Sequence, residues 1–293
     1  MWPLIRYLAS HYIPTRVYLQ LFYRWRFGRW ADLRSPTTLN EKFHWKKLYG
    51  HQPFHTTVCD KYAVREWVAG RIERRYLVPL IAVAESVEEL DLGRLPDPCI
   101  IKTTRGSGQN IILRDNRSIE EKPLKNLLRK WMKQNLFYLS REPPYRDIKP
   151  RLVVEKLLTD SDGKIPLDFK FHCFHGEIEA IQVDIDRFTD HRRNFYDVNW
   201  ELLPFTWSWW DRSGPLWPNG RKIERPAQLD EMMTVAGTLA EEFDYVRVDL
   251  YNCRGAVYFG ELTLYHGGGW ERFDPPHYDR IFGEKLDLHW HAR

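Results

Sequence analysis

The chain has 293 residues, 43% hydrophobic and 29% charged, a composition typical of a soluble globular protein with room for two or three sub-domains. No uninterrupted apolar run reaches the length needed to cross a bilayer, which argues against an integral membrane protein. The four cysteines form no CxxC pair, so we expect reduced thiols in a cytoplasmic protein.

The net charge of +4 is concentrated in residues 1–34, where six arginines stand against one acid, Asp32, so the rest of the chain sums to about −1. The stretch "LQLFYRWRFGRW" in this segment mixes apolar and aromatic residues with arginine. This pattern indicates either a helix docked on the body of the protein, which we favour, or a surface for peripheral contact with anionic lipid at the inner membrane face. Because the rest of the chain is not basic, we do not expect nucleic acid as a partner.

The next elements follow from periodicity and turn signals. We expect helices over residues 36–50 and 57–70, and a buried strand in "YLVPLIAVAES". "CIIKTTRGSGQNIILR" predicts a strand, a glycine-rich turn and a second strand, and residues 119–138 predict a helix. "RLVVEKLL" predicts a strand, and "DFKFHCFHGEIEAIQVDIDR" predicts a hairpin that turns at His175–Gly176. Another strand pair is expected in "RRNFYDVNWELLPF", an amphipathic helix in "PAQLDEMMTVAGTLAEEF" and a last strand pair in "VRVDLYNCRGAVYFGELTL".

This order of elements predicts an α+β protein with mixed sheets. The stretch "REPPYRDIKP" is rich in proline and charge, which favours a boundary near residue 150. We therefore expect a helical, basic and aromatic segment over 1–58, a small α/β sub-domain over 59–150 and a larger one over 151–293.

The glycine-rich turn is the first candidate site. Lys102 ends an apolar strand, and Gly106, Ser107 and Gly108 follow before the next strand. Backbone amides in such a loop can hold phosphate oxygens, and a lysine adds positive charge. The lysine precedes the glycines, so this is not a Walker A loop, and taken alone the stretch fits an ordinary hairpin turn equally well.

The last strand pair is the second candidate site. Arg247 and Asp249 are two residues apart and share a face, and Glu261 on the next strand can face the same side. Charged side chains on apolar strands are costly unless they pair or bind a ligand. Mg²⁺ prefers one or two carboxylates with phosphate oxygens, so the pattern is typical of a magnesium site or of a partly buried Arg–Asp pair.

The ordered series of charges resembles the ATP-grasp superfamily. More closely, "LNEKFHWKKLYG", "DKYAVREWV", "VEKLL", "DFKFHCFHGEI", "VRVDLY" and "YFGELTLYHGGG" resemble its TupA-like branch, named for teichuronopeptide biosynthesis, from about residue 36 to the C-terminus. The resemblance implies an ATP-grasp fold in which two α/β sub-domains clasp ATP, preceded by the helical N-terminal segment.

The resemblance also implies roles for individual residues. Those implied to bind ATP are Lys61 and Lys102 at the phosphates, Gly106, Ser107 and Gly108 in a flap, Glu155, Lys156, Leu157 and Leu158 at the adenine hinge, and Asp162 at the ribose. Arg247 and Lys170 are implied to be catalytic, and Asp249, Glu261 and Thr263 to be metal ligands. Thr263 stands where the superfamily usually has asparagine, which weakens the case for a second Mg²⁺. We assign His266, Gly267, Gly268 and Arg272 to the substrate, although His266 also fits an ordinary structural histidine.

The implied activity is an ATP-dependent carboxylate–amine ligase that works through an acyl phosphate. The family setting implies joining an amino acid or amine to a uronic-acid-containing surface glycan, such as a capsule polysaccharide, or to its precursor. The alternatives are a nucleotide-sugar glycosyltransferase and an ATP-grasp kinase that phosphorylates a sugar hydroxyl. The only glycosyltransferase-like acidic cluster, "DID" at 184–186, lies inside a predicted hairpin.

Overall fold

The computed structural model describes residues 11–114, 120–187 and 189–290, so Arg6 of the predicted basic segment lies outside it. The chain divides into two compact units, a larger one of Met1–His51 with Pro166–Arg293 and a smaller one of Gln52–Ile165. This division differs from the expected domain limits for two reasons. Strand β4 (Leu152–Lys156), beyond the expected boundary at 150, pairs with β1 (Leu80–Ala84) and β2 (Cys99–Thr103) of the smaller unit. The N-terminal helices belong to the larger unit instead of forming a separate domain.

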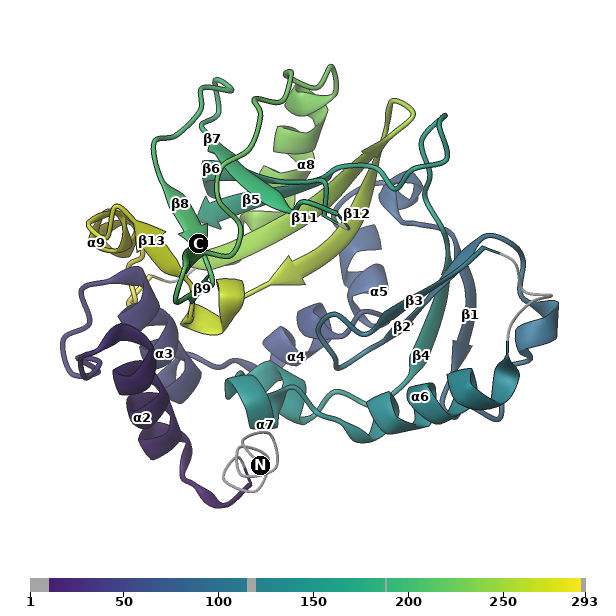
Figure 1. Ribbon diagram of the computed structural model, residues 1–293, viewed down its shortest axis with the longest axis horizontal. Helices are drawn as coiled ribbons and strands as arrows, with labels where there is room; N and C mark the ends of the chain where they lie inside the picture. The colour runs from purple at the N-terminus through teal and green to yellow at the C-terminus, as the bar shows by residue number, and fades with distance from the viewer. Residues whose placement is uncertain (1–10, 115–119, 188, 291–293) are drawn as a thin grey trace. The chain divides into compact units, whose positions relative to one another are not determined.

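The larger unit is built on a five-stranded antiparallel sheet of order β12-β11-β5-β6-β7 (Figure 1). Its strands are β5 (Asp168–Phe174), β6 (Glu177–Ile185), β7 (Arg192–Tyr196), β11 (Tyr245–Cys253) and β12 (Ala256–Thr263). Helix α8 (Leu229–Ala240) packs aliphatic side chains against β5, β6 and β11, and so covers the apolar face of the sheet. Because side chains alternate along a strand, the polar residues of these strands gather on the opposite face.

Within the described residues, the larger unit also contains helices α2 (Thr15–Phe27), α3 (Leu39–Tyr49) and α9 (Tyr278–Lys285). Helix α3 begins at a capping box in which Thr38 and Glu41 satisfy each other's backbone amides, as the predicted cap region requires. The remaining elements are short, namely β8 (Thr206–Ser208), β9 (Trp210–Asp211), β10 (Gly214–Pro215), β13 (Arg272–Asp274) and the 3-10 turn η5 (His266–Gly269). No helix within the described residues is both long and apolar enough to cross a membrane.

The smaller unit contains a four-stranded antiparallel sheet of order β1-β4-β2-β3. Its other strands are β1 (Leu80–Ala84), β2 (Cys99–Thr103) and β3 (Asn110–Leu113), and its helices are α4 (Pro53–Cys59), α5 (Val64–Ala69), α6 (Glu121–Lys133) and α7 (Phe137–Ser140). Short 3-10 turns lie at Arg74–Tyr76, Leu92–Arg94 and Pro143–Arg146. Leu128 of α6 packs with Ile101 and Val154, which places the core of this unit between α6 and one sheet face (Figure 1). Side chains alternate along β2 and β4, so Lys102 and Glu155, which follow Ile101 and Val154, lie on the opposite face of the sheet.

Two predicted helices are interrupted by side-chain caps. The helix expected over 57–70 is two helices, because the Asp60 carboxylate accepts hydrogen bonds from the amides of Tyr62 and Ala63 and turns the chain there. The helix expected over 119–138 stops at Lys133, and Asn135 caps the following turn by accepting from the amide of Phe137. The strand pair expected in "RRNFYDVNWELLPF" is reduced to β7 and a single bridge between Tyr196 and Leu202.

The buried His44 of α3 makes stability depend on pH. Its Nε2 lies 2.9 Å from the carbonyl of Gly269, and burial, together with the charge of Lys47, holds its pKa well below the usual range. The unfolded chain binds a proton at this histidine below about pH 6.5 while the folded chain does not, so stability falls as the pH drops below that value. We predict that His44→Phe flattens this dependence by up to about 1.4 kcal/mol per pH unit. Denaturant unfolding of both proteins from pH 7.5 downward measures the effect, and identical slopes would contradict it.

Candidate active site

The larger unit presents charged side chains on the sheet face opposite α8. Asp249 of β11 lies directly across from Lys170 of β5 on one side and from Glu261 of β12 on the other. Arg247, two residues earlier on β11, shares this face. The carboxylates of Asp249 and Glu261 therefore lie side by side, as strand alternation predicts, and Lys170 lies beside Asp249 on a third strand.

Asp249 is held by two cations. Nε and Nη2 of Arg247 donate to its two carboxylate oxygens, both at 2.6 Å, in a bidentate pair that orients the guanidinium. Lys170 Nζ donates to Asp249 Oδ2 at 2.8 Å. Arg247 Nη2 also donates to Glu261 Oε1 at 3.2 Å. The Asp249 side chain is only 3% exposed, whereas that of Glu261 is 43% exposed, so Glu261 is the carboxylate that solvent can reach.

Lys170 is enclosed by carboxylates. Its ammonium contacts Asp168 and lies 3.8 Å from Asp184, in addition to its bond with Asp249. Burial alone would lower the pKa of Lys170, but the charges of Asp168 and Asp249 outweigh burial and raise it. The pKa of Arg247 is likewise raised, because Asp249 and Glu261 outweigh the effect of burial. Both side chains therefore stay charged, and Lys170 serves first to neutralise its three carboxylates.

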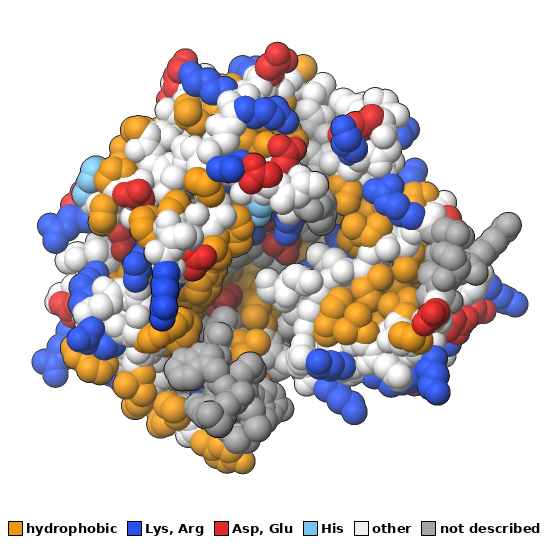
Figure 2. Space-filling model, in the orientation of Figure 1, with side chains coloured by type: hydrophobic (Ala, Val, Ile, Leu, Met, Phe, Trp, Pro, Cys, Tyr) orange, Lys and Arg blue, Asp and Glu red, His pale blue; other side chains and the backbone are white. Residues whose placement is uncertain are grey.

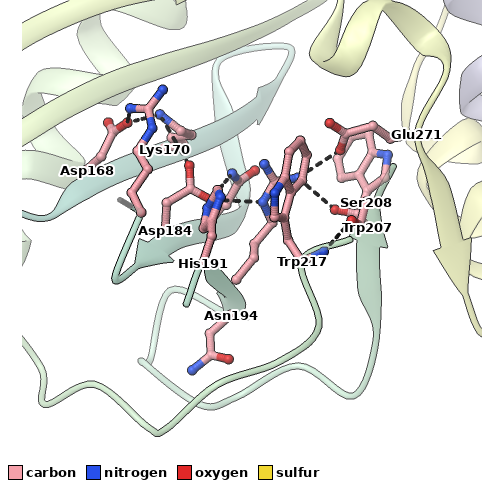
Figure 3. A network of polar contacts seen from close by, with 12 residues as sticks. Asp168, Lys170, Asp184, His191, Asn194, Trp207, Ser208, Trp217 and Glu271 are labelled. Atoms are coloured by element: carbon pink, nitrogen blue, oxygen red, sulfur yellow. Dashed lines mark hydrogen bonds and ion pairs between the residues drawn. The ribbon is translucent and has the colours of Figure 1, made fainter. Parts of the chain in front are cut away.

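A second set of contacts continues from Arg247 into the interior. Arg247 Nη1 lies 2.9 Å from Nδ1 of His266, and Nε2 of His266 lies 3.0 Å from Glu271. Arg193 then joins Glu271, at 2.8 Å, to Asp184, at 2.9 Å. Figure 3 shows Asp168, Lys170, Asp184 and Glu271 in this network. Burial, with the charge of Arg247, holds the pKa of His266 well below its usual range, so Nδ1 of its neutral ring accepts from Arg247.

The smaller unit holds a second charged cluster on the sheet face opposite its core. Lys102 of β2 donates to Glu155 Oε2 at 2.7 Å, and Arg65 of α5 donates to Glu155 Oε1 at 2.7 Å. Arg65 also donates to the carbonyl of Val78 at 2.8 Å, which ties α5 to the start of β1. Glu155 therefore uses its carboxylate to hold two cations from different elements, and its side chain is 9% exposed.

The glycine-rich turn joins β2 and β3 as predicted, and Lys61 is tied to it. Lys61 lies in the turn between α4 and α5 and donates to the carbonyl of Gly106 at 2.8 Å. A Cβ added to Gly106 would lie 2.0 Å from Oε1 of Gln109 and 2.6 Å from Oγ1 of Thr103. Gly108 has a φ of +69°, a conformation that side chains rarely adopt. Both glycines are thus required by the shape of the loop.

We predict that Gly106→Ala destabilises the loop. The Gln109 side chain can move aside, but Thr103 is β-branched and sits in a strand, so the added methyl group costs about 1–3 kcal/mol of unfolding free energy. Gly93→Ala is the control, because the nearest atom to its added Cβ is 3.6 Å away and its φ is not positive. Thermal unfolding of the two variants measures the difference, and equal melting temperatures would refute the prediction.

A comparison with protein-family models decides the family. The TupA-like ATP-grasp model matches residues 41–287, most of the chain. The chain belongs to the TupA-like ATP-grasp family. The expected α+β class and ATP-grasp fold are confirmed. The expectation of mixed sheets is wrong, because every pair of named strands in the described residues is antiparallel. No curated protein matches the sequence.

Several solved structures are similar to this TupA-like ATP-grasp chain at low identity. D-alanine–D-alanine ligase from Bacillus anthracis is 18% identical over 71% of this chain and 57% of its own, with a TM-score of 0.37. The ATP-grasp ligase PsnB, complexed with a phosphomimetic variant of its minimal precursor, Mg and ADP, is 10% identical over 84% and 65%, with a TM-score of 0.44. Phosphoribosylamine–glycine ligase from Thermotoga maritima is 13% identical over 71% and 48%, with a TM-score of 0.41. The chain thus spans little more than half the length of the first of these proteins.

The donor chemistry of Asp249, Glu261 and Thr263 suits magnesium in a TupA-like ATP-grasp protein. No group of three or more His, Cys, Asp or Glu side chains in the described ranges is placed to hold a metal ion by itself. Mg²⁺ needs only one or two carboxylates when phosphate oxygens and water complete its shell. Thr263 lies opposite Arg247 on β12, two residues from Glu261, so its hydroxyl shares their face. Each carboxylate oxygen can accept more than one bond, so the cations on Asp249 leave room for a metal ion.

The other predicted ATP-binding residues have varied surroundings. Ser107 is exposed at the tip of the glycine loop. At the predicted hinge, the amide of Lys156 donates to the carbonyl of Pro79, and the amide of Leu157 donates to the carbonyl of Pro98. These two bonds fix the backbone after Glu155. Leu158 lies beyond the end of β4. Asp162 lies in an exposed turn, paired with Lys164 at 2.9 Å, and is not part of the Lys102–Glu155 cluster.

The predicted substrate residues lie around η5. Gly267 and Gly268 both have positive φ, and the carbonyl of Gly268 accepts from Lys47 at 2.6 Å, so α3 supports this turn. Arg272 donates to the backbone carbonyl of Arg26 at the end of α2. His266 is 1% exposed. Its burial and its two partners favour a structural role over that of a proton carrier.

Several charged residues of the two clusters, one in each unit, are not predicted by the sequence patterns. They are Arg65 beside Glu155, and Asp168, Asp184, Arg187, Arg193 and Glu271 around Lys170 and Arg247. Asp168 carried a usable signal, because it precedes Lys170 by two residues and must share its face. Asp184 belongs to the "DID" stretch, of which Asp184 and Ile185 end strand β6 of the β5–β6 hairpin and Asp186 follows it.

Proposed function

We propose that this chain is an ATP-dependent carboxylate–amine ligase that joins an amino acid or amine to a uronic-acid-containing surface glycan or its precursor. Membership of the TupA-like ATP-grasp family supports the reaction class. The observation that carries the proposal is the cluster of Arg247, Asp249 and Glu261 on adjacent strands, with buried cations on one side and a reachable carboxylate on the other.

The proposed reaction has two steps. An oxygen of the substrate carboxylate attacks the γ-phosphorus of ATP, ADP leaves, and an acyl phosphate forms on the substrate. The amine nitrogen then attacks the acyl carbon, inorganic phosphate leaves, and the nitrogen loses a proton to give the amide. Neither step needs a covalent bond to the protein, so positioning and charge stabilisation supply the catalysis.

The residues of each unit have separate tasks in this proposal. In the smaller unit, Lys61, Lys102 and the Gly106–Gly108 loop would contact the phosphates. In the larger unit, Asp249, Glu261 and Thr263 would hold Mg²⁺, which when bound neutralises phosphate charge and orients the triphosphate. Arg247, fixed by its bidentate bond, would stabilise the charge that develops on the transferring phosphoryl group.

Lys170 and His266 act through Arg247 and Asp249. Lys170 balances the buried carboxylates and keeps Asp249 in place. His266 accepts from the Nη1 atom of Arg247 and so fixes the guanidinium from the side opposite Asp249. We therefore infer that both are positioning residues. The proposal places the enzyme in the cytoplasm, at times at the inner membrane face through residues 1–34.

Two experiments test the function. ATP with Mg²⁺ should raise the melting temperature of the full chain, whereas nucleotide sugars should not, and the reverse result would favour a glycosyltransferase. Hydroxylamine, which intercepts acyl phosphates, should yield a hydroxamate in the presence of ATP and a panel of uronates and amino acids. ATP consumption with a phosphorylated sugar and no hydroxamate would replace the ligase with a kinase.

A further inference from the structure

Helix α2 has one buried face and one exposed apolar face. Tyr18, Leu19 and Tyr23 are buried in a cluster with Trp270, which docks the helix on the larger unit as expected. On its other side, the residues Val17, Leu21 and Trp25 are exposed by 47%, 50% and 61%. Their spacing of four residues aligns them along the helix. The docking of α2 therefore does not account for its apolar outer face, the α2 stripe (Val17, Leu21 and Trp25).

Arginines surround the α2 stripe. Arg16 and Arg24 are exposed on α2 itself, and Arg29 and Arg34 are exposed just beyond it, where Trp30 is 57% exposed. Asp32 is the only acid between residues 11 and 34, and Arg29 is paired with Glu41 of α3. Hydrophobic side chains and Lys or Arg side chains lie side by side over this region at the lower left of Figure 2. The surface thus combines aliphatic side chains, indole rings and positive charge.

We propose that the α2 stripe and its arginines bind the surface of a bilayer containing anionic phospholipid. A helix of 13 residues is too short to span a bilayer but can lie in the interface with its apolar side chains among the acyl chains. Tryptophan favours the interface because its ring is apolar and its N–H is polar, and nearby arginines are attracted to anionic headgroups. The inference goes beyond the ligase chemistry, because no residue of the proposed ATP site takes part.

The positive charge around the α2 stripe favours an anionic lipid surface as its partner over a second copy of the chain or a nucleic acid. In a symmetric dimer built on α2, Arg16 and Arg24 of one copy would face those of the other, and α2 carries no acidic residue to offset them. Nucleic acid would satisfy the arginines but has no use for the aliphatic side chains Val17 and Leu21. An anionic bilayer accommodates both features at once.

Vesicle flotation of the full chain tests the proposal. The protein should float with vesicles of phosphatidylcholine mixed with phosphatidylglycerol and remain below with phosphatidylcholine alone. Combined replacement of Val17, Leu21 and Trp25 by serine should lower the partition coefficient about tenfold or more. Replacing Arg16 and Arg24 by glutamine should lower it about tenfold. The matched control replaces Leu216 and Ile281, exposed apolar residues elsewhere in the same unit, by serine and should bind as the wild type does.

Circular dichroism establishes that each variant is folded, and the single variant Trp25→Ser is used if the triple variant is not. Equal flotation of the wild type and the α2 variants would overturn the proposal, as would failure of the wild type to float with anionic vesicles. Loss of flotation on deleting residues 1–10, with no effect of the α2 variants, would assign lipid binding elsewhere and also overturn it. A wild-type dimer that the triple variant converts to monomer, measured by analytical ultracentrifugation without vesicle binding, would assign the stripe to a second copy. None of these outcomes bears on ATP binding.

Discussion

Asp249→Asn is expected to lower the free energy of unfolding by about 3–5 kcal/mol, the usual cost of removing one partner from a buried ion pair. The substitution leaves Arg247 and Lys170 without the carboxylate that they share at 2.6 and 2.8 Å. Denaturant unfolding followed by tryptophan fluorescence measures the loss. We also expect ATP turnover to disappear, because Arg247 loses the bidentate bond that orients it.

The control for this prediction is an aspartate paired at the surface. Asp230 forms an ion pair with Arg225, and its side chain is 74% exposed, so Asp230→Asn should change the stability by less than about 1 kcal/mol. An Asp249→Asn protein as stable as the wild type would show that the buried charges of β5 and β11 are not coupled as the contacts indicate.

Glu261→Gln is expected to reduce turnover by about a hundredfold or more while leaving stability almost unchanged. Glu261 lies opposite Asp249, but its side chain is 43% exposed and its 3.2 Å contact with Arg247 is at the edge of the network. Its contribution to stability should therefore resemble that of a surface pair, about 0–1 kcal/mol. Its proposed contribution to activity is larger, because Mg²⁺ needs an anionic oxygen there and an amide is a weaker ligand.

Steady-state ATP hydrolysis and amide formation, together with melting temperatures, test this second prediction. Glu177→Gln is the matched control, since Glu177 is an exposed glutamate on β6 of the same sheet. A Glu261→Gln enzyme with wild-type turnover would remove Glu261 from the metal site, and one that unfolds would make it a structural residue. Asp249→Asn is thus expected to lower stability, because Asp249 is buried between two cations. Glu261→Gln is expected to lower activity alone, because Glu261 is exposed and can bind a ligand.

Local patterns were enough to predict the strands that carry the site. Alternation along β11 placed Arg247 and Asp249 on one face, and the short turn to β12 brought Glu261 beside them. The turn at His175–Gly176 and the glycine loop after Lys102 were also predictable, because such turns need residues that tolerate positive φ. These features depend on residues that are close in sequence.

Contacts between distant segments were not predictable in the same way. Lys170 meets Asp249 because β5 pairs with β11 in one particular register, and no local pattern sets the pairing of strands about 80 residues apart. Arg65 meets Glu155 from a helix that precedes the sheet. The alternation of polar residues on β6 showed that Asp184 faces one side, but not that Arg193 and Lys170 would neutralise it there.

Calorimetric titration of ATP into the full chain, first with Mg²⁺ and then with excess EDTA, tests the central claim that this protein binds ATP through a magnesium site. We predict saturable binding with Mg²⁺, its loss in EDTA, and binding weakened about tenfold or more by Glu261→Gln. Absence of binding with Mg²⁺, or the same affinity in EDTA, would contradict the claim.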